Sequence, residues 1–224
     1  MAVLNQNQGM TELPDINLWS SPEHALEYLR RADSIPHRTE GEATLLEFLP
    51  RNPQHILDLG SGAGRLLALV KSARPEAKFV AVDFSPTMLD ALRKTFARDE
   101  SVTIVPHDLA ASLPDLGKFD AVVSCFAIHH LVHARKRDLY REVFALLTPG
   151  GVFCNLEHVA SPTSSLHHQF LTKLDVTPEQ EDPSNKLLDL SIQLGWLREI
   201  GFEDVDCQWK WRELALITGA KPDR

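Results

Sequence analysis

The sequence has few of the features that mark secreted, membrane-spanning or metal-dependent proteins. Its 224 residues include three cysteines, Cys125, Cys154 and Cys207, without disulfide or metal-site spacing. A scattered, odd set of this kind favours reduced thiols. No apolar run approaches the ~18 residues of a membrane span, and residues 1–10 carry no leader pattern of basic and then apolar residues. We therefore expect a cytoplasmic protein with no membrane contact, no disulfide framework and no metal site.

Positive charge is also scarce. There are 23 Lys and Arg against 31 Asp and Glu, which gives a formal net charge of −8. Binding to nucleic acid needs clustered Lys and Arg, so we expect no nucleic-acid partner. The length of 224 residues and the hydrophobic fraction of 43% suit one domain with a full core. We expect that domain to work as a monomer or a homodimer.

Strand-like and helix-like segments alternate from His55 onward. The apolar runs that are typical of strands cover residues 55–59, 79–83, 102–105, 119–125 and 152–156. Amphipathic stretches typical of helices stand between them, for example residues 65–73. This alternation predicts parallel βαβ units in a doubly wound α/β fold.

The segment before this alternation predicts helices as well. We expect residues 1–50 to form an N-terminal helical cap on the same domain. One helix is predicted to start near Ser20, and a second after a capping box at Thr39.

The segment after the alternation is of a different kind. Residues 159–190 are polar and contain proline, and we interpret them as a lid-like insertion in the domain of residues 51–224. The stretches 202–211 and 213–218 follow with almost no gap. Two adjacent strands with a tight connection form a hairpin, so one of them must run antiparallel to the rest.

The strongest motif is a glycine-rich turn after the first predicted strand. It has the sequence Leu-Asp-Leu-Gly-Ser-Gly-Ala-Gly over residues 57–64. Glycines let the backbone approach a ligand closely at the carboxyl edge of a parallel sheet. Because Arg65 follows the third glycine, the spacing is G-x-G-x-G rather than the G-x-G-x-x-G of dinucleotide-binding proteins. The acidic Asp58 would face a pyrophosphate unfavourably, and it suits a ligand with an ammonium group and a sulfonium.

Three more blocks are predicted at the same sheet edge. Asp83 ends the second strand, where a carboxylate can accept both hydroxyls of a ribose. Asp108 follows the third strand and can accept a bond from an adenine amino group, with a helix cap as the alternative. The fourth strand runs into an irregular turn over residues 125–131, whose first members are alternatively plain core.

These four blocks, in this order, resemble the class I methyltransferases that use S-adenosylmethionine. The resemblance covers residues 55–219, and residues 196–202 with 209–211 resemble a bacterial small-molecule subgroup of unknown substrate. It implies a Rossmann-like seven-stranded sheet of order 3-2-1-4-5-7-6 with the last strand antiparallel, and S-adenosyl-L-methionine as cofactor. The residues that it places around the cofactor are Asp58, Gly60, Ser61, Gly62, Gly64, Asp83, Phe84, Met88, Asp108, Leu109, Cys125 and Phe126. Arg38 is a candidate clamp for the cofactor's carboxylate, or an ordinary surface residue.

The candidate catalytic residues stand at two strand ends. They are His129 and His130 after the fourth strand, and Glu157 and His158 at the end of the fifth. Methyl transfer needs alignment first, and it needs a base only if the acceptor must lose a proton, a task that suits histidine. In an extended segment consecutive rings point oppositely, so we expect one histidine to face the cleft and the other to bond inward. The structural alternatives are a solvated turn, a buried hydrogen-bonded ring and a loop cap.

The expected activity is that of an S-adenosylmethionine-dependent methyltransferase, EC 2.1.1 type, acting on a small-molecule O, N or C nucleophile. One alternative is a catalytically silent S-adenosylmethionine-binding protein. Another is an RNA or protein methyltransferase. The net charge disfavours this last alternative, and so does the lack of an Asn/Asp-Pro-Pro-Tyr/Phe block after the fourth strand.

Overall fold

The computed structural model describes residues 18–223, so the first part of the expected N-terminal cap lies outside the described residues. The strands are β1 (His55–Leu59), β2 (Lys78–Asp83), β3 (Val102–Pro106), β4 (Phe119–Cys125), β5 (Leu147–His158), β6 (Glu203–Trp211) and β7 (Leu214–Ala220). The α-helices are α1 (Pro22–Arg31), α2 (Arg38–Phe48), α3 (Arg65–Ala73), α4 (Pro86–Thr95), α5 (His133–Leu146), α6 (Ser164–Lys173) and α7 (Leu190–Ile200). Short 3₁₀ turns are η1 (Leu18–Ser20), η2 (Ala32–Ser34), η3 (Ile128–His130) and η4 (Pro178–Gln180).

The seven strands form one sheet of order β3-β2-β1-β4-β5-β7-β6. Neighbouring strands from β3 through to β5 pair in parallel, whereas β7 is antiparallel to both β5 and β6. The predicted strand order and the antiparallel last strand are therefore confirmed. The register places the ends of β1, β2 and β4 side by side, because Leu59 lies opposite both Val82 and Ser124.

Two hydrophobic clusters fill the two faces of the sheet. Ile56 of β1 belongs to the cluster that also contains Leu45 of α2 and Leu67 of α3. The next residue, Leu57, belongs to the other cluster, with Leu139 of α5 and Leu197 of α7. Successive strand residues point to opposite faces, so β1 packs against helices on both sides. This double burial explains why Ile56, Leu57 and Leu59 of β1 are all apolar, and it makes the buried Asp58 an exception.

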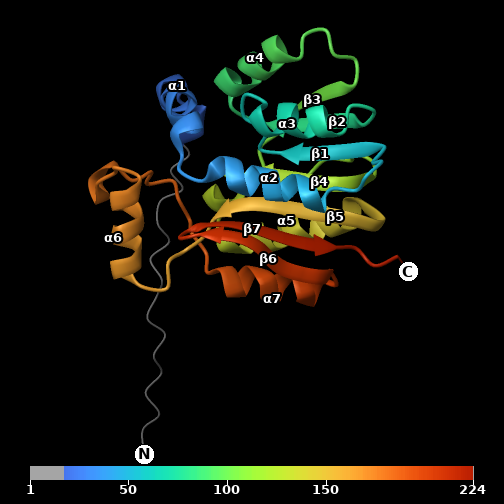
Figure 1. Ribbon diagram of the computed structural model, residues 1–224. Coiled ribbons are helices and arrows are strands. Elements are labelled where there is room, and N and C mark those ends of the chain that lie inside the picture. Colours follow the sequence, from blue (N-terminus) through green and yellow to red (C-terminus); the bar gives the residue numbers. More distant parts are fainter. Residues whose placement is uncertain (1–17, 224) are drawn as a thin grey trace, which may run out of the picture.

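The helices α1 and α6 lie beyond the sheet, at the end toward which β1 points (Figure 1). Ser21 caps α1 by accepting a hydrogen bond from the backbone N–H of His24 at 3.4 Å, whereas the capping box expected at Thr39 is wrong. Instead α2 begins at Arg38, after His37 in a left-handed conformation and without a side-chain cap. The N-terminal part of the chain thus reaches the carboxyl edge of the sheet through α1, and α2 then packs on one face of the sheet (Figure 1).

Several expectations about composition can be compared with the described residues. Cys125 and Cys154 are buried in strands, as predicted, and all three cysteines are free. None of the helices in residues 18–223 combines the length and the apolarity that crossing a bilayer requires. In the same part of the chain, no group of three or more His, Cys, Asp or Glu is arranged to hold a metal ion.

Candidate active site

The glycine-rich turn connects β1 to α3 at the carboxyl edge of the sheet. The backbone N–H groups of Gly60 and Ser61 both donate to the carbonyl oxygen of Val82, at 2.8 and 2.9 Å. Gly60 has φ +69°, and a Cβ there would collide with the Cβ of Ala127. Only glycine combines this conformation with so close an approach of two loops. The turn after β1 is thus held against the turn after β4.

Asp58 lies under this turn and is 1% exposed. Neither of its carboxylate oxygens has a hydrogen-bond partner within residues 18–223. Burial raises the pKa of Asp58 to about 7 from an ordinary value of 3.8, against a smaller lowering by the neighbouring Ser61 hydroxyl, which donates to the main-chain carbonyl of Asp58 at 2.9 Å. A buried carboxylate without partners is costly to ionise, and a cationic ligand group would remove that cost. Asp58 is therefore chemically suited to a positively charged ligand group.

Asp83 stands at the end of β2, beside the same turn. Its two carboxylate oxygens accept hydrogen bonds from the backbone N–H groups of Gly62, at 2.8 Å, and of Ser85, at 2.9 Å. These bonds orient the carboxylate and leave each oxygen further lone pairs for a ligand. Asp108, after β3, accepts a bond from the backbone N–H of Ala110 at 2.9 Å. This bond closes a turn, and since no helix lies between β3 and β4 in the described chain, the helix cap that the sequence left open for Asp108 is wrong. The carboxylate keeps acceptor sites for a second bond.

Arg38 is buried in a network and is not an ordinary surface residue. Its Nε donates to Glu42 Oε1 at 2.7 Å, and Glu42 also pairs with Arg65 at 3.0 Å. Nη1 of Arg38 donates to the hydroxyl of Tyr28 at 3.2 Å, and the guanidinium lies 5.3 Å from the ring centre of Phe126. Helices α1 and α2 are thereby linked to the strand end that carries Phe126.

Cys125 and Phe126 form the wall opposite the glycine-rich turn. Phe126 has φ +52°, a strained conformation for a bulky residue. Its backbone N–H donates to the carbonyl oxygen of Leu156 at 2.8 Å. Burial raises the pKa of the Cys125 thiol to about 12, so it stays protonated. The turn after β4 therefore presents a thiol and an aromatic ring rather than a charge.

All but one of the residues predicted around the cofactor line a single cavity of about 280 Å³. The exception is Gly64, which caps α3 and packs against Leu92 and Phe96. The residues present fit the expected cofactor, since Asp58 offers an unpaired carboxylate to an ammonium group and Asp83 offers acceptors to a ribose. The cavity is lined in addition by residues that sequence reasoning missed, among them Trp19, Tyr28, Ser184 and Lys186.

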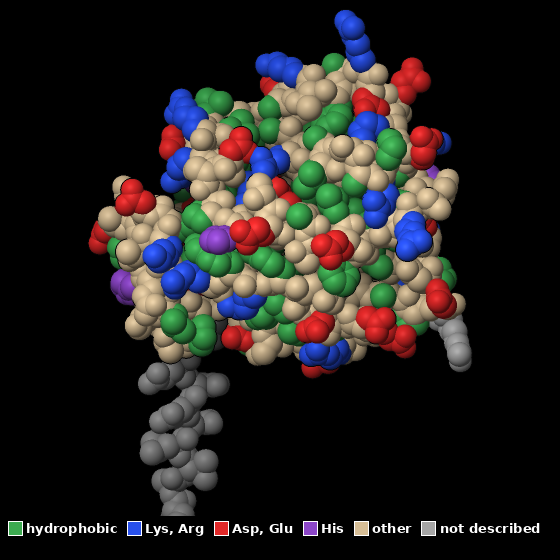
Figure 2. All heavy atoms as spheres, viewed as in Figure 1, with side chains coloured by type: hydrophobic (Ala, Val, Ile, Leu, Met, Phe, Trp, Pro, Cys, Tyr) green, Lys and Arg blue, Asp and Glu red, His purple; other side chains and the backbone are tan. Residues whose placement is uncertain are grey.

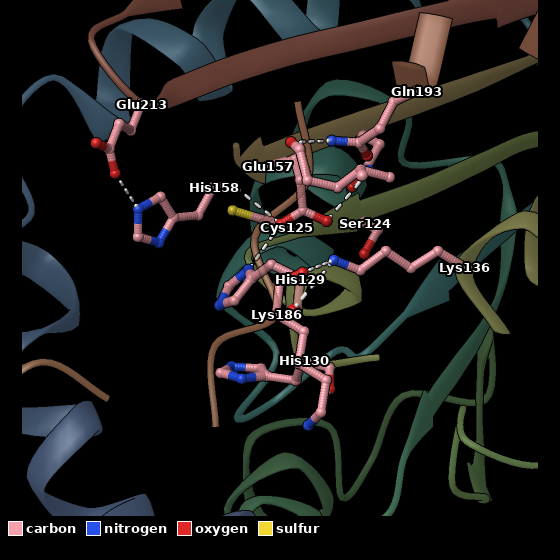
Figure 3. Close-up of polar contacts among 12 residues, drawn as sticks. Ser124, Cys125, His129, His130, Lys136, Glu157, His158, Lys186, Gln193 and Glu213 are labelled. Atoms are coloured by element: carbon pink, nitrogen blue, oxygen red, sulfur yellow. Dashed lines mark hydrogen bonds and ion pairs between the residues drawn. The ribbon is translucent and has the colours of Figure 1, made fainter. Parts of the chain in front are cut away.

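The turn after β4 places both candidate histidines on one side. Residues 128–130 form the 3₁₀ turn η3, and the rings of His129 and His130 lie 4.0 Å apart, centre to centre (Figure 3). The opposite orientation expected for these rings is wrong, because a 3₁₀ turn has no alternation of period two. One half of the expectation holds, since His129 bonds inward.

His129 is joined to Glu157, the candidate from β5. Its Nδ1 lies 2.7 Å from Glu157 Oε1, and the same oxygen accepts from the backbone N–H of His158 at 2.8 Å. Burial raises the pKa of Glu157 and lowers that of His129 well below its ordinary value. With the proton of the neutral ring on Nδ1, its Nε2 keeps a lone pair. This arrangement is a carboxylate-oriented imidazole.

His130 is oriented by the insertion rather than by the sheet. Ser184 Oγ donates its single proton to Asp182 at 2.6 Å, so its contact of 2.9 Å with His130 Nδ1 is a bond that the ring donates. Burial lowers the pKa of His130 well below its ordinary value. The ring is therefore neutral with a lone pair on Nε2, the form required of a base.

Two lysines hold the backbone of this turn (Figure 3). Lys136 Nζ donates to the carbonyl oxygens of His129, at 3.2 Å, and of Lys186. Lys186 Nζ donates to the carbonyl oxygen of His130 at 3.1 Å. Burial lowers the pKa of Lys136 to about 8. Because both carbonyl groups are hydrogen-bonded, the backbone from which the two histidine side chains extend is held in place.

His158 belongs to a third pair. Its Nε2 lies 2.9 Å from Glu213 Oε2, and Glu213 also contacts Ser161 and His167 of α6. His167 in turn lies 3.1 Å from Glu181. The strand ends of β5 and β7 are thereby connected to the insertion of residues 159–190.

A second cavity, of about 450 Å³, adjoins the first. His129, His130 and His158 line it, whereas Glu157 lines neither cavity and lies behind His129. The residues common to both cavities are Trp19, Tyr28, Phe126 and His130. Two ligands bound in the two cavities would therefore meet at this shared wall.

Comparison with known proteins agrees with this geometry. A family model described as a methyltransferase domain matches residues 57–153. A demethylmenaquinone methyltransferase from Clavibacter sepedonicus is 30% identical over 207 residues, which cover 80% of this chain and 78% of that protein. A carboxy-S-adenosyl-L-methionine synthase from Helicobacter hepaticus is 24% identical over 211 residues, which cover 84% of this chain and 87% of that protein.

A solved structure, described as an O-methyltransferase family protein from Burkholderia thailandensis, has the same fold with a TM-score of 0.71 at 19% identity. The match covers 91% of this chain and 61% of that one, so this chain spans less than two thirds of its length. The sheet order, the cavity around Asp58 and these matches lead to one assignment. The chain belongs to the class I S-adenosylmethionine-dependent methyltransferases, and it is an enzyme that uses S-adenosyl-L-methionine.

Proposed function

We propose that this enzyme moves the methyl group to a small molecule bound in the second cavity, with His130 as the base. The observation that carries the proposal is the shared wall: His130 lines both cavities, and its Nδ1 is tied to Ser184. In this arrangement Asp58 holds the ammonium group of S-adenosylmethionine, and Asp83 holds its ribose. Arg38 lines the same cavity, where its Nη2 donates to Cys125 Sγ at 3.6 Å, and we assign its guanidinium to the cofactor's carboxylate.

The bound cofactor supplies a methyl group that is already activated by the sulfonium charge. The protein's task is to orient the acceptor, exclude water and accept one proton. His130 accepts that proton on Nε2, and the chain through Ser184 to Asp182 stabilises the resulting charge. His129, oriented by Glu157, is the neighbouring acceptor of hydrogen bonds.

Two segments cover the site in this proposal. Residues 18–36 of the N-terminal cap contribute Trp19 and Tyr28 to both cavities. The insertion of residues 159–190 contributes Phe170 and Leu171 to the second cavity and Ser184 to the first, which supports a role as a lid. Acceptor choice would then depend on these two segments rather than on the sheet.

A macromolecular acceptor has less support. On the face drawn in Figure 2, Lys and Arg side chains alternate with Asp and Glu and form no basic surface. The large exposed hydrophobic side chains are Leu26, Val132, Leu166 and Ile192, which come from four separate segments. Together with three free thiols, this supports a cytoplasmic enzyme that is a monomer or a homodimer.

The test is incubation of the protein with methyl-labelled S-adenosylmethionine and a whole-cell extract, whose small-molecule, RNA and protein fractions are then analysed by mass spectrometry. We expect S-adenosylhomocysteine and one extract component heavier by one labelled methyl group. Label recovered only in RNA or protein would overturn the small-molecule proposal. A cofactor that gains mass and keeps its methyl group would instead indicate the activity for which the Helicobacter hepaticus relative is named. Binding without either product would indicate a silent binding protein.

A further inference from the structure

The size of the second cavity limits what it can hold. Its volume is about 450 Å³. An apolar cavity of about 150 Å³ is enough for benzene, so this one has room for a compound of two or three rings. The second cavity can therefore hold an acceptor much larger than a short acid or amine.

The walls of this cavity are mainly apolar. They include Ile35, Phe126, Phe170, Leu171, Leu174 and Val176. Phe170 and Leu171 come from α6 and are buried, and the ring of Phe170 lies 5.2 Å from that of His158. Apolar walls that include aromatic rings favour an apolar ring system as the ligand.

The charged groups of the second cavity oppose an anionic acceptor. Among the described residues that line it, Arg31 stands against three carboxylates, Glu179, Glu181 and Asp182. Arg31 already pairs with Glu27 at 3.3 Å. A bound carboxylate or phosphate would thus lack the guanidinium fork that such groups need.

The second cavity is no better suited to a cationic acceptor. Asp182 pairs with His24 at 3.3 Å and accepts from Ser184, and Glu181 pairs with His167 at 3.1 Å. Two of the three carboxylates are therefore already engaged. At the inner end stand the neutral rings of His129 and His130, which can accept a hydrogen bond but cannot balance a charge.

We propose that the acceptor is an uncharged, largely apolar ring compound that carries a hydroxyl group, such as a phenol or a naphthol. The hydroxyl lies at His130 and the rings lie against Phe126 and Phe170. This substrate class rests on the proposed function, because it takes the second cavity as the acceptor site.

The methyl transfer balances with the acceptor hydroxyl, the cofactor and His130. The hydroxyl proton goes to Nε2 of His130 while the acceptor oxygen forms a bond to the methyl carbon. The bond between that carbon and the sulfur breaks, and its electron pair stays on the sulfur. The positive charge thus passes from the sulfonium to the imidazole, where the bond through Ser184 to Asp182 stabilises it. The products are a methyl ether and S-adenosylhomocysteine.

The experiment uses three probes that share one bicyclic ring and differ in charge: 2-naphthol, 2-naphthoate and 2-naphthylmethylammonium. Their affinities are measured by calorimetry on the full chain saturated with S-adenosylhomocysteine. We expect 2-naphthol to bind at least about tenfold more tightly than either ion, because an ion would lose hydration without gaining a partner. Either ion binding as tightly as 2-naphthol would overturn the proposal.

Two variants on one helix locate the probe. Leu174 follows α6 and lines the second cavity, so Leu174→Trp should weaken 2-naphthol binding at least about tenfold by filling the space. Leu166→Trp, on the exposed side of α6, is the control and should bind 2-naphthol normally. Unchanged affinity in Leu174→Trp would overturn the proposed location.

A turnover assay completes the design. With S-adenosylmethionine present, 2-naphthol should yield 2-methoxynaphthalene, and His130→Gln should cut its rate by about 100-fold while 2-naphthol still binds. Failure of S-adenosylhomocysteine to bind would sink the proposed function itself. Binding of S-adenosylhomocysteine with no binding of 2-naphthol would sink only the acceptor class.

Discussion

Nδ1 of His129 lies 2.7 Å from Oε1 of Glu157, and this pair joins the end of β4 to the end of β5 behind the second cavity. The donors His158 N and Asn155 Nδ2 converge on the same carboxylate, at 2.8 and 3.4 Å. An ionised carboxylate can accept all of these bonds. The amide of a glutamine cannot, because its NH₂ group would face one of these donors or the ring. Glu157 therefore fixes both the orientation and the tautomer of His129.

Replacing Glu157 by Gln tests that role. We expect the turnover number to fall by about 10- to 100-fold with little change in the affinity for S-adenosylmethionine, since Glu157 lines neither cavity. Steady-state kinetics and calorimetry give the two quantities. Glu199→Gln, which removes the surface pair of Glu199 with Arg137, is the control and should act as wild type. Normal turnover in Glu157→Gln would mean that the oriented ring plays no part in catalysis.

Asp83→Ala tests the ribose end of the first cavity. Cofactor binding should weaken by roughly 1.5–3 kcal/mol, the range for hydrogen bonds to a charged group, while the fold stays intact. Asp90→Ala, on the exposed face of α4 where Asp90 pairs with Arg93, should leave the affinity unchanged. Calorimetry measures the affinity and circular dichroism checks the fold. If Asp83→Ala binds the cofactor like wild type, the ribose is held elsewhere.

The glycine-rich turn offers a matched pair of substitutions. Gly60 and Gly62 both have positive φ, +69° and +54°, so an alanine at either position costs about 1–2 kcal/mol of conformational strain. A Cβ at Gly60 would also collide with Ala127, whereas at Gly62 the nearest atom is Met88 Sδ at 3.9 Å. We therefore expect Gly60→Ala to lower the free energy of unfolding clearly more than Gly62→Ala. Equal losses in urea titrations would show that the two loops are not held together as described.

Much of this fold could be predicted because its signals are local. The apolar run of β1 and the glycines after it specify a buried strand and a tight turn over residues 55–64, and the bounds of β1 agree with the prediction. Asp58, Asp83 and Asp108 could be placed at one edge because parallel strands end together. That the Asp58 carboxylate lacks hydrogen-bond partners among the described residues could not be predicted, because this depends on every group that surrounds it in the fold.

The geometry of the acceptor side could not be predicted, because it depends on contacts between segments that are distant in the sequence. His130 is oriented by Ser184, 54 residues further along the chain, and no spacing rule predicts such a pair. The wrong orientation of the two histidine rings came from treating η3 as extended chain. Consecutive side chains of a 3₁₀ turn are about 120° apart rather than opposite, and here the two rings lie 4.0 Å apart. Trp19 and Tyr28 were missed because an aromatic residue near a helix is more often packing than binding surface.

The contact between α6 and the sheet should depend on pH. Partial burial opposes it, but hydrogen bonds to Glu213 and Glu181 raise the pKa of His167 above 6.5. Burial likewise favours the neutral form of Glu213, yet bonds from His158, Ser161 and His167 lower its pKa below 4.5. The histidine contribution is complete below pH 6.5 and is lost as the pH rises through its raised pKa. The glutamate contribution is complete above pH 4.5, so α6 is held most firmly between these two values.

Hydrogen exchange of the α6 amides, corrected for intrinsic rates, measures this effect. Protection should be greater at pH 6 than at pH 8.5, and bound cofactor and acceptor should increase it, as expected of a lid. His167→Gln should remove the difference between the two pH values. His168→Gln is the control, because Nδ1 of His168 bonds to the carbonyl oxygen of Ser164 within its own helix rather than to Glu213 or Glu181. Equal protection of α6 at both pH values would contradict this account of the contact.

Asp58 links stability to binding. Its pKa in the folded protein is about 7, against an ordinary value of 3.8. Between these values the folded state binds more protons than the unfolded state, so stability falls as the pH rises through this window, by up to about 4 kcal/mol.

Asp58→Asn removes the charge but leaves a buried amide. We expect it to raise the free energy of unfolding at pH 8 by about 1–3 kcal/mol and to weaken cofactor binding. If Asp58→Asn instead lowered the free energy of unfolding at pH 8, the claim that the Asp58 carboxylate is buried without a partner would be refuted.

Calorimetric titration with S-adenosylhomocysteine from pH 6 to pH 8.5, in wild type and in Asp58→Asn, tests the central claim most directly. An ammonium group beside Asp58 favours the ionised carboxylate, so wild-type affinity should rise as the pH passes about 7 and then level off. The Asp58→Asn protein should bind more weakly and without this rise. Absence of binding at every pH, or the same pH profile in both proteins, would contradict the claim that Asp58 holds the ammonium group of the cofactor.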